Sequence, residues 1–292
     1  MIHFGRLSTA MITPFDKNGN IDFQKTSILI DYLINHGSDS LVIAGTTGES
    51  PTLSTEEKIA LFKHTVKEVN GRVPVIAGTG SNNTAASIHL TKKAEEAGVD
   101  AIMLVVPYYN KPSQEGLYQH FKAIAESTKL PVMLYNIPGR SVINLSVDTI
   151  VRLSELPNIV AIKEASGDLD AMSEIISRTK DDFALYTGDD ALTIPVLSIG
   201  GVGVVSVASH IAGTEMQSMI SSFINGDYAA AAKQHRTLLP VVKQLFASPN
   251  PTPVKTALQV KGIDVGSVRL PLVPLTSSER NELIEVMNTY LK

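Results

Sequence analysis

Lys163 stands where a charged side chain is unusual. The segment NIVAIKE (158–164) resembles a strand buried on both faces, and Lys163 follows its four apolar residues. Lysine is rarely buried alone, because moving an ammonium group out of water costs several kcal/mol. Either a carboxylate such as Glu164 or Asp189 neutralises it, or it is an amine nucleophile. A buried amine loses its proton more readily, and a neutral amine attacks a keto group to form a Schiff base. The position favours the nucleophile.

Two more side chains could act beside this lysine. Tyr135 ends the preceding apolar run, PVMLYN (131–136). An isolated strand tyrosine is usually a core residue, but here its hydroxyl could carry a proton to and from a Schiff base. Arg140 follows five residues later. It is either a solvated loop charge or a bidentate ligand for a substrate carboxylate.

Short apolar runs recur along the chain, with helical segments between most of them. The clearest helix covers 55–69, where Ser54 and Glu57 form a capping box. Runs about 20–33 residues apart predict parallel βα units, and eight of them predict an α/β fold, the closed (β/α)8 TIM barrel. An open, doubly wound sheet is the alternative. The runs are 7–13, 40–45, 73–79, 101–107, 131–136, 159–164, 183–187 and 203–208.

The final part of the chain contains no further strand signal. Helices are predicted over 226–246, 252–262 and 277–291, the last with a capping box of Thr276 and Glu279. We therefore expect a catalytic barrel over 1–224 and a C-terminal helical domain over 225–292.

Polar residues follow the ends of several predicted strands. GTTGE (45–49), GTG (78–80), PYY (107–109) and TGD (187–189) each come directly after an apolar run. In a parallel barrel the carboxyl ends of all strands meet at one face, which carries the chemistry. The barrel prediction therefore brings these segments together with Lys163, Tyr135 and Arg140.

Composition excludes several classes of function. The 292-residue chain has a net charge of −4 and no cysteine, which excludes disulfides, thiolate nucleophiles and cysteine-based zinc or iron–sulfur sites. The charge does not favour a nucleic-acid or membrane partner. The seven histidines form no HExxH pair, and GTGSNN (78–83) lacks the third glycine of a dinucleotide fingerprint. We expect neither a metal nor a cofactor and, without a signal-peptide pattern, a cytoplasmic protein.

Five motifs in this order resemble the pyruvate-dependent class I aldolase superfamily and, within it, the dihydrodipicolinate synthase family. The resemblance covers essentially the whole chain, and Arg140 is the residue that favours the synthase branch. It implies condensation of pyruvate with L-aspartate 4-semialdehyde, a step of lysine and diaminopimelate biosynthesis, by a homo-oligomer, a tetramer in this family. The motifs are GTTGES (45–50), YNIPGR (135–140), IKEASGD (162–168), TGDD (187–190) and NPTPVK (250–255).

The resemblance also implies a role for individual residues. Lys163 would form the imine with pyruvate, and Tyr135 would relay protons with help from Thr47 and from Tyr109 of a neighbouring subunit. Arg140 would bind the carboxylate of the semialdehyde. The remaining substrate-binding residues would be Thr46 and Thr47 for the pyruvate carboxylate, and Gly188 and Val205 around the lysine.

Two other interpretations remain open at the level of sequence. A sialic acid lyase or a 2-keto-3-deoxysugar acid aldolase would share Lys163 and Tyr135 but would need hydroxyl-binding groups for a polyol. Arg140 beside the Thr46–Thr47 pair is evidence against these. A family member without catalysis, acting as a binding or regulatory protein, would have no reason to keep the full set of reactive side chains.

Overall fold

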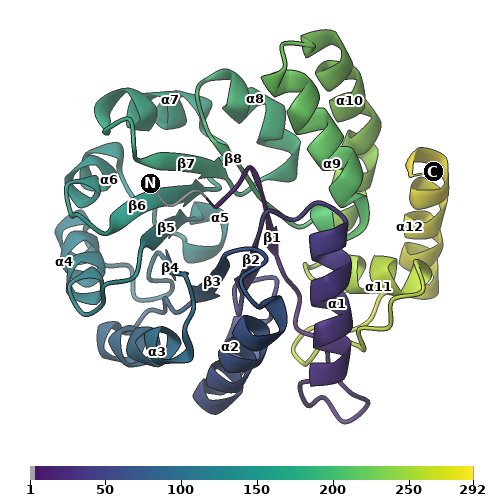
Figure 1. Cartoon of the computed structure of the whole chain (residues 1–292), viewed down its shortest axis with the longest axis horizontal. Helices are drawn as coiled ribbons and strands as arrows, with labels where there is room; N and C mark the ends of the chain where they lie inside the picture. Colours follow the sequence, from purple (N-terminus) through teal and green to yellow (C-terminus); the bar gives the residue numbers. More distant parts are fainter. Residues whose placement is uncertain (1–3, 292) are drawn as a thin grey trace.

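The computed structural model describes residues 4–291 and forms a closed barrel of parallel strands in the order β1 to β8 (Figure 1). Closure comes from pairing of the first strand with the last, Ser8 opposite Val205. The barrel prediction is confirmed, and the open-sheet alternative is wrong. The strands are β1 (Leu7–Ala10), β2 (Ser40–Ile43), β3 (Val75–Gly78), β4 (Ala101–Val105), β5 (Val132–Asn136), β6 (Ile159–Glu164), β7 (Ala184–Thr187) and β8 (Gly203–Ser206).

Helices surround the barrel and continue beyond it. Both predicted capping boxes are present, at Ser54 and Glu57 and at Thr276 and Glu279. Within residues 4–291 no helix has the length and apolar character needed to span a bilayer. The helices, with two 3-10 turns, are α1 (Phe23–Asn35), η1 (Ser50–Thr52), α2 (Thr55–Val69), α3 (Thr84–Ala97), α4 (Gln114–Ala125), α5 (Pro138–Ser141), α6 (Val147–Ser154), α7 (Leu169–Arg178), η2 (Asp190–Leu192), α8 (Thr193–Ser198), α9 (Ser209–Ile224), α10 (Tyr228–Leu245), α11 (Thr252–Val260) and α12 (Ser277–Tyr290).

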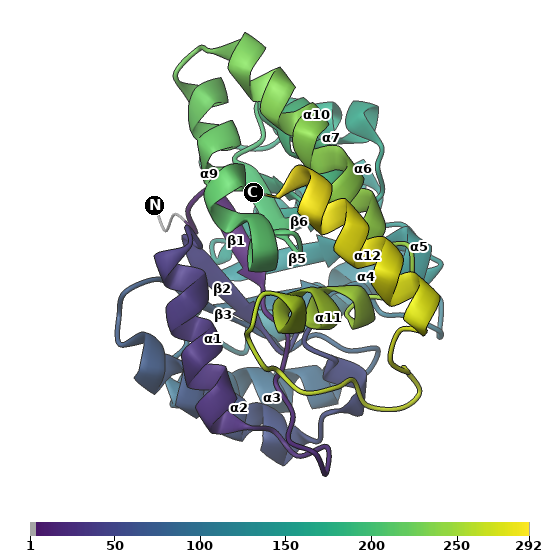
Figure 2. The same ribbon diagram turned by 90° about the vertical axis from the view of Figure 1, so that its right-hand side faces the viewer.

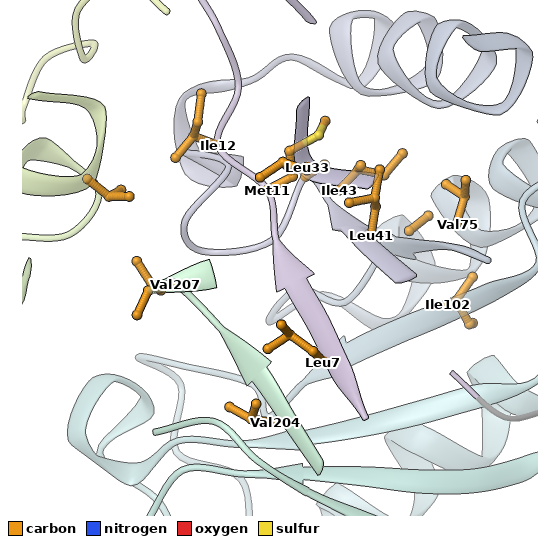
Figure 3. Close-up of a cluster of buried hydrophobic side chains, with 14 of the residues drawn as sticks. Leu7, Met11, Ile12, Leu33, Leu41, Ile43, Val75, Ile102, Val204 and Val207 are labelled. Carbon is orange, nitrogen blue, oxygen red and sulfur yellow. The ribbon is translucent and has the colours of Figure 1, made fainter. Parts of the chain in front are cut away.

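The core has two layers, because successive side chains of a strand point to opposite faces. One layer fills the barrel interior and includes Met103, Met133, Tyr135, Tyr186 and Val205. The other lies between the strands and the surrounding helices, where Figure 3 shows part of it around β1, β2 and β8.

The C-terminal helices lie against one side of the barrel, next to α1 and α9 (Figures 1 and 2). Helix α10 packs along α9, and α12 packs on both α10 and α11. The expected division at 224/225 falls in the turn between α9 and α10. The separation into two domains stays a prediction.

A buried histidine joins the first and last strands of the barrel. The Nδ1–H of His210 donates to the carbonyl of Val207, at 2.8 Å, and its Nε2 accepts the backbone N–H of Ile12, at 3.1 Å. Ile12 follows β1 and Val207 follows β8. His210 is fully buried, and burial lowers its pKa to about 4. A second proton on Nε2 would face the Ile12 N–H, so the contact requires a neutral ring.

We expect the protein to lose stability as the pH falls from about 6.5 to 4. The native pKa of His210 lies below the ordinary 6.5, so only the unfolded chain gains this proton within that window. The full contribution, roughly 3 kcal/mol of unfolding free energy, is present above pH 6.5 and lost toward pH 4. Burial also lowers the pKa of His120 to about 4, which adds in the same direction.

Urea unfolding at several pH values between 7 and 4 measures this effect, with His210→Gln as the comparison. The variant should be less stable at pH 7 but should change less with pH. An identical pH slope in both proteins would show that His210 contributes nothing to the acid sensitivity.

Candidate active site

Lys163 lies inside the barrel at one level with two tyrosines. The strand register places it opposite Tyr135 on β5 and Tyr186 on β7. Its side chain is buried, and its Nζ lies 4.2 Å from the centre of the Tyr135 ring. Within residues 4–291 Lys163 forms no ion pair, so neither Glu164 nor Asp189 neutralises it. The amine is therefore not committed to a structural carboxylate.

A glycine provides the space for the lysine side chain. A Cβ atom on Gly188, directly after β7, would lie 2.9 Å from Cε of Lys163 and 2.7 Å from Cβ of Ala165. Any other residue would displace the lysine from its place against Tyr135. Val205 on β8 is also buried and belongs to the same interior cluster as Tyr135. Gly188 thus lies beside the lysine, whereas a role for Val205 around the lysine stays a prediction.

A pocket of about 220 Å³ opens at this end of the barrel. Thr46, Tyr135 and Arg140 all contribute to its wall. Arg140 lies on the short helix α5 and is exposed, and within the described chain its guanidinium has no carboxylate partner. The mouth of the pocket therefore presents a cation that is free to bind an anionic ligand. The remaining wall residues are Ala44, Gly45, Ser50, Pro51, Gly80, Met103, Val105, Tyr108, Ile137 and Ser141.

Thr47 is buried in the turn after β2 and does not itself line this pocket. Its Oγ1 accepts a 2.9 Å hydrogen bond from Nδ2 of Asn250, a residue 203 positions later. The next carbonyl along, that of Gly48, accepts a 2.7 Å bond from the Thr13 hydroxyl. The sequence does not indicate this bond, because the resemblance includes NPTPVK (250–255) but assigns no role to Asn250.

The loop that carries Arg140 is attached to β6 by buried polar groups. Nδ2 of Asn136 donates to Glu164, at 2.9 Å, and to Oδ1 of Asn144, at 2.6 Å. Oδ1 of Asn136 accepts the backbone N–H of Leu145. Burial raises the pKa of Glu164, although its hydrogen bonds oppose that change. These bonds connect both ends of the Arg140 loop to the strand that bears Lys163.

Tyr108 and Tyr109 are adjacent on the loop after β4, but their side chains lie in different surroundings. Tyr108 lines the pocket of its own barrel, whereas Tyr109 does not. The Tyr109 side chain is 88% exposed, and its backbone has a φ of +73°. A left-handed conformation is costly for a tyrosine, and such positions concentrate at functional sites. Of the expected residues, Thr46, Tyr135 and Arg140 line the pocket. Lys163 contacts the Tyr135 ring, but neither it nor Thr47, Tyr109, Gly188 or Val205 forms part of the pocket wall.

This arrangement supplies a buried amine, an adjacent phenol and a free cation at the pocket mouth. In residues 4–291 no three His, Asp or Glu side chains lie close enough together to hold a metal ion. A parallel barrel with such a lysine on its sixth strand defines the class of lysine-dependent barrel aldolases.

Comparison with known proteins identifies the family within this class. The chain belongs to the dihydrodipicolinate synthetase family, whose model matches residues 3–289. It is 72% identical to a 4-hydroxy-tetrahydrodipicolinate synthase of Bacillus subtilis, over 97% of this chain and 98% of that protein. A Bacillus velezensis protein of the same name is 69% identical, over 98% of this chain and 99% of that one. A solved dihydrodipicolinate synthase of Bacillus anthracis is 64% identical and superimposes with a TM-score of 0.99, over the whole of both chains.

Proposed function

We propose that this protein is a 4-hydroxy-tetrahydrodipicolinate synthase, which joins pyruvate to L-aspartate 4-semialdehyde in the route to diaminopimelate and lysine. One observation carries the assignment to this site. The Lys163 amine is buried, free of any carboxylate within the described chain, and 4.2 Å from the ring of Tyr135, which lines the same pocket as Arg140. The synthase names of the relatives support the choice of substrates. A cytoplasmic location agrees with such a biosynthetic step.

The reaction begins with an imine. The amine of Lys163 attacks C2 of pyruvate, and the carbonyl oxygen leaves as water after protonation by the Tyr135 phenol. The protonated imine withdraws electrons, so the adjacent methyl group gives up a proton and an enamine forms. The enamine carbon then attacks the aldehyde carbon, and the aldehyde oxygen takes up a proton. Transfer of the imine carbon to the amino group of the semialdehyde closes the ring and frees Lys163.

Two groups of residues would hold the substrates during these steps. In the turn after β2, the hydroxyl of Thr46 and the backbone N–H groups of Thr46 and Thr47 would bind the carboxylate of pyruvate. Arg140 at the mouth is left for the carboxylate of the second substrate, which enters after the imine has formed. Gly188 keeps space for the lysine, and Val205 adds to the apolar wall.

Borohydride reduction in the presence of pyruvate tests this function. The protein should gain the mass of a reduced pyruvate adduct, and peptide mapping should place the adduct on Lys163. Turnover with L-aspartate 4-semialdehyde, N-acetylmannosamine and glyceraldehyde in parallel then identifies the second substrate. Preferred use of either of the other aldehydes would contradict the synthase assignment, and a trapped but inactive protein would favour a binding role.

We also propose an oligomer in which Tyr109 completes the site of a neighbouring subunit, within a tetramer built as a dimer of dimers. Tyr109 is 88% exposed and outside its own pocket, which supports this arrangement. Its hydroxyl would join Thr47 and Tyr135 as a third member of the proton relay. A monomer would then lack one member of the relay.

Tyr109→Phe should lower kcat by about a hundred-fold, the lower end of what a positioned proton-transfer group contributes to catalysis. Tyr228→Phe, another exposed tyrosine on the C-terminal side of the molecule, should leave kcat unchanged. Activity per molecule should also fall on dilution, in step with the dissociation measured by light scattering. A fully active monomer would refute the shared site.

A further inference from the structure

The turn after β2 is held at three successive positions by groups from distant parts of the chain. Asn250 donates to the hydroxyl of Thr47, and Thr13 donates to the carbonyl of Gly48. Glu49 is almost fully buried and forms a 2.6 Å ion pair with Lys255. Its other oxygen accepts the backbone N–H of Arg269, at 2.9 Å. The segment after α10 therefore contacts the turn on both sides of Gly48: Asn250 binds Thr47, and Lys255 and Arg269 bind Glu49.

The ion pair fixes the place of this segment. Lys255 also donates to the carbonyl of Ser267, at 2.8 Å, and lies 4.1 Å from the centre of the Phe15 ring. Glu49 has a φ of +56°, a conformation that a glutamate adopts only when its surroundings enforce it. The turn and the C-terminal segment are thus held together independently of Asn250. A change at Asn250 can alter the Thr47 hydroxyl while these contacts keep the backbone in place.

The direction of the Asn250–Thr47 hydrogen bond determines where the threonine proton points. A side-chain NH2 group can only donate, so Thr47 must accept from it. The single O–H of Thr47 then remains available, and within residues 4–291 it has no other hydrogen-bond partner. Oδ1 of Asn250 is buried without a partner in the same part of the chain. An unpaired buried oxygen reduces stability, so stability alone does not account for the asparagine.

We propose that Asn250 is a positioning residue that directs the Thr47 hydroxyl proton into the active site, toward the Tyr135 relay. This inference rests on the proposed function, in which Thr47 takes part in proton transfer. Asn250 itself does not line the pocket. Its contribution is to donate to the Thr47 oxygen, so that the O–H of Thr47 is left to donate to another group.

Two substitutions separate hydrogen-bond direction from packing. Asn250→Asp has the same shape, but as a carboxylate it can only accept, so it would draw the Thr47 proton toward itself. We expect it to lower kcat by about a hundred-fold, the lower end of the contribution of a positioned proton-transfer group. Asn250→Ala leaves the hydroxyl unoriented and should lower kcat by about ten-fold. The KM for pyruvate should change little in either variant.

A double-mutant cycle with Thr47→Val provides the decisive measurement. If Asn250 acts through Thr47, Asn250→Ala should have no further effect on kcat once the hydroxyl is absent. Additive losses would overturn the proposal, because they would show that Asn250 acts through the fold. Ser248→Ala is the matched control, since it removes a 2.7 Å bond to Glu279 in the same segment without involving Thr47. It should keep wild-type kcat.

Borohydride trapping distinguishes this inference from the proposed function. A wild-type protein that traps pyruvate and uses the semialdehyde, while both Asn250 variants keep normal kcat, would contradict the role of Asn250 alone. A wild-type protein that does neither would contradict the function itself. Thermal unfolding of each variant identifies any that fail to fold, and the cycle is then completed with Asn250→Ser, whose smaller side chain cannot reach as far.

Discussion

Lys163→Ala should abolish the trapping of pyruvate and all turnover while leaving the fold intact. Its Nζ is the amine placed against Tyr135, and removal of the side chain leaves no nucleophile at that position. Lys163→Arg should fail equally, because a guanidinium stays protonated and cannot attack a carbonyl. Circular dichroism of both variants verifies the fold. A full yield of adduct in either variant would disprove the imine assignment.

Two other lysines provide controls for this experiment. Burial lowers the pKa of Lys255 to about 8, so this amine is a chemical competitor for the imine. It is committed to Glu49 and to the carbonyl of Ser267. Peptide mapping of the trapped protein should therefore show label on Lys163 and none on Lys255. Lys58→Ala, which removes another partly buried lysine with a lowered pKa, should trap pyruvate normally.

Arg140→Ala should impair condensation far more than imine formation. Arg140 is exposed at the mouth of the pocket, so its guanidinium is placed for the second substrate. Loss of a bidentate contact to the semialdehyde carboxylate should cost roughly 2–4 kcal/mol, seen as a fall of about thirty- to a thousand-fold in kcat/KM. The yield of reduced pyruvate adduct should not change.

The matched control is Arg152→Ala. It removes the same charge from α6, where Arg152 contacts Glu115 and the ring of Tyr118 outside the pocket. Its kinetics should equal those of the unmodified enzyme. Normal use of the semialdehyde by the Arg140 variant would mean that another group binds that carboxylate.

Local signals were sufficient to predict most of the fold. Helix α2 has the predicted bounds because its capping box and its stripe of apolar residues are encoded within one segment. The strands begin within two residues of the predicted positions, but several end earlier. The run 7–13 continues past β1 because Met11 and Ile12, though apolar, pack in the outer core layer beyond the ladder. Hydrophobic burial identifies such residues as core but does not reveal where strand pairing ends.

The candidate site was predictable wherever its residues follow strand ends. Lys163, Tyr135 and Gly188 could be identified in this way, since parallel strands bring their carboxyl ends together. The supporting contacts could not. The bond from Asn250 to Thr47 joins residues 203 positions apart, and no local pattern in either segment indicates its partner. The sequence around His210 likewise does not indicate its bond to Ile12, because only the closed barrel brings the ends of β1 and β8 together.

The bonds between the β2 turn and the C-terminal segment also set the order in which the enzyme can mature. A chain made from its N-terminus releases Thr47 and Glu49 from the ribosome long before Asn250 and Lys255. Loops of this length close slowly, because their closure entropy must be overcome before the contact forms. All eight strands precede residue 250, so strand pairing can proceed while the turn still lacks its supports. The turn that carries Thr47 therefore receives its C-terminal supports only after all eight strands have been made.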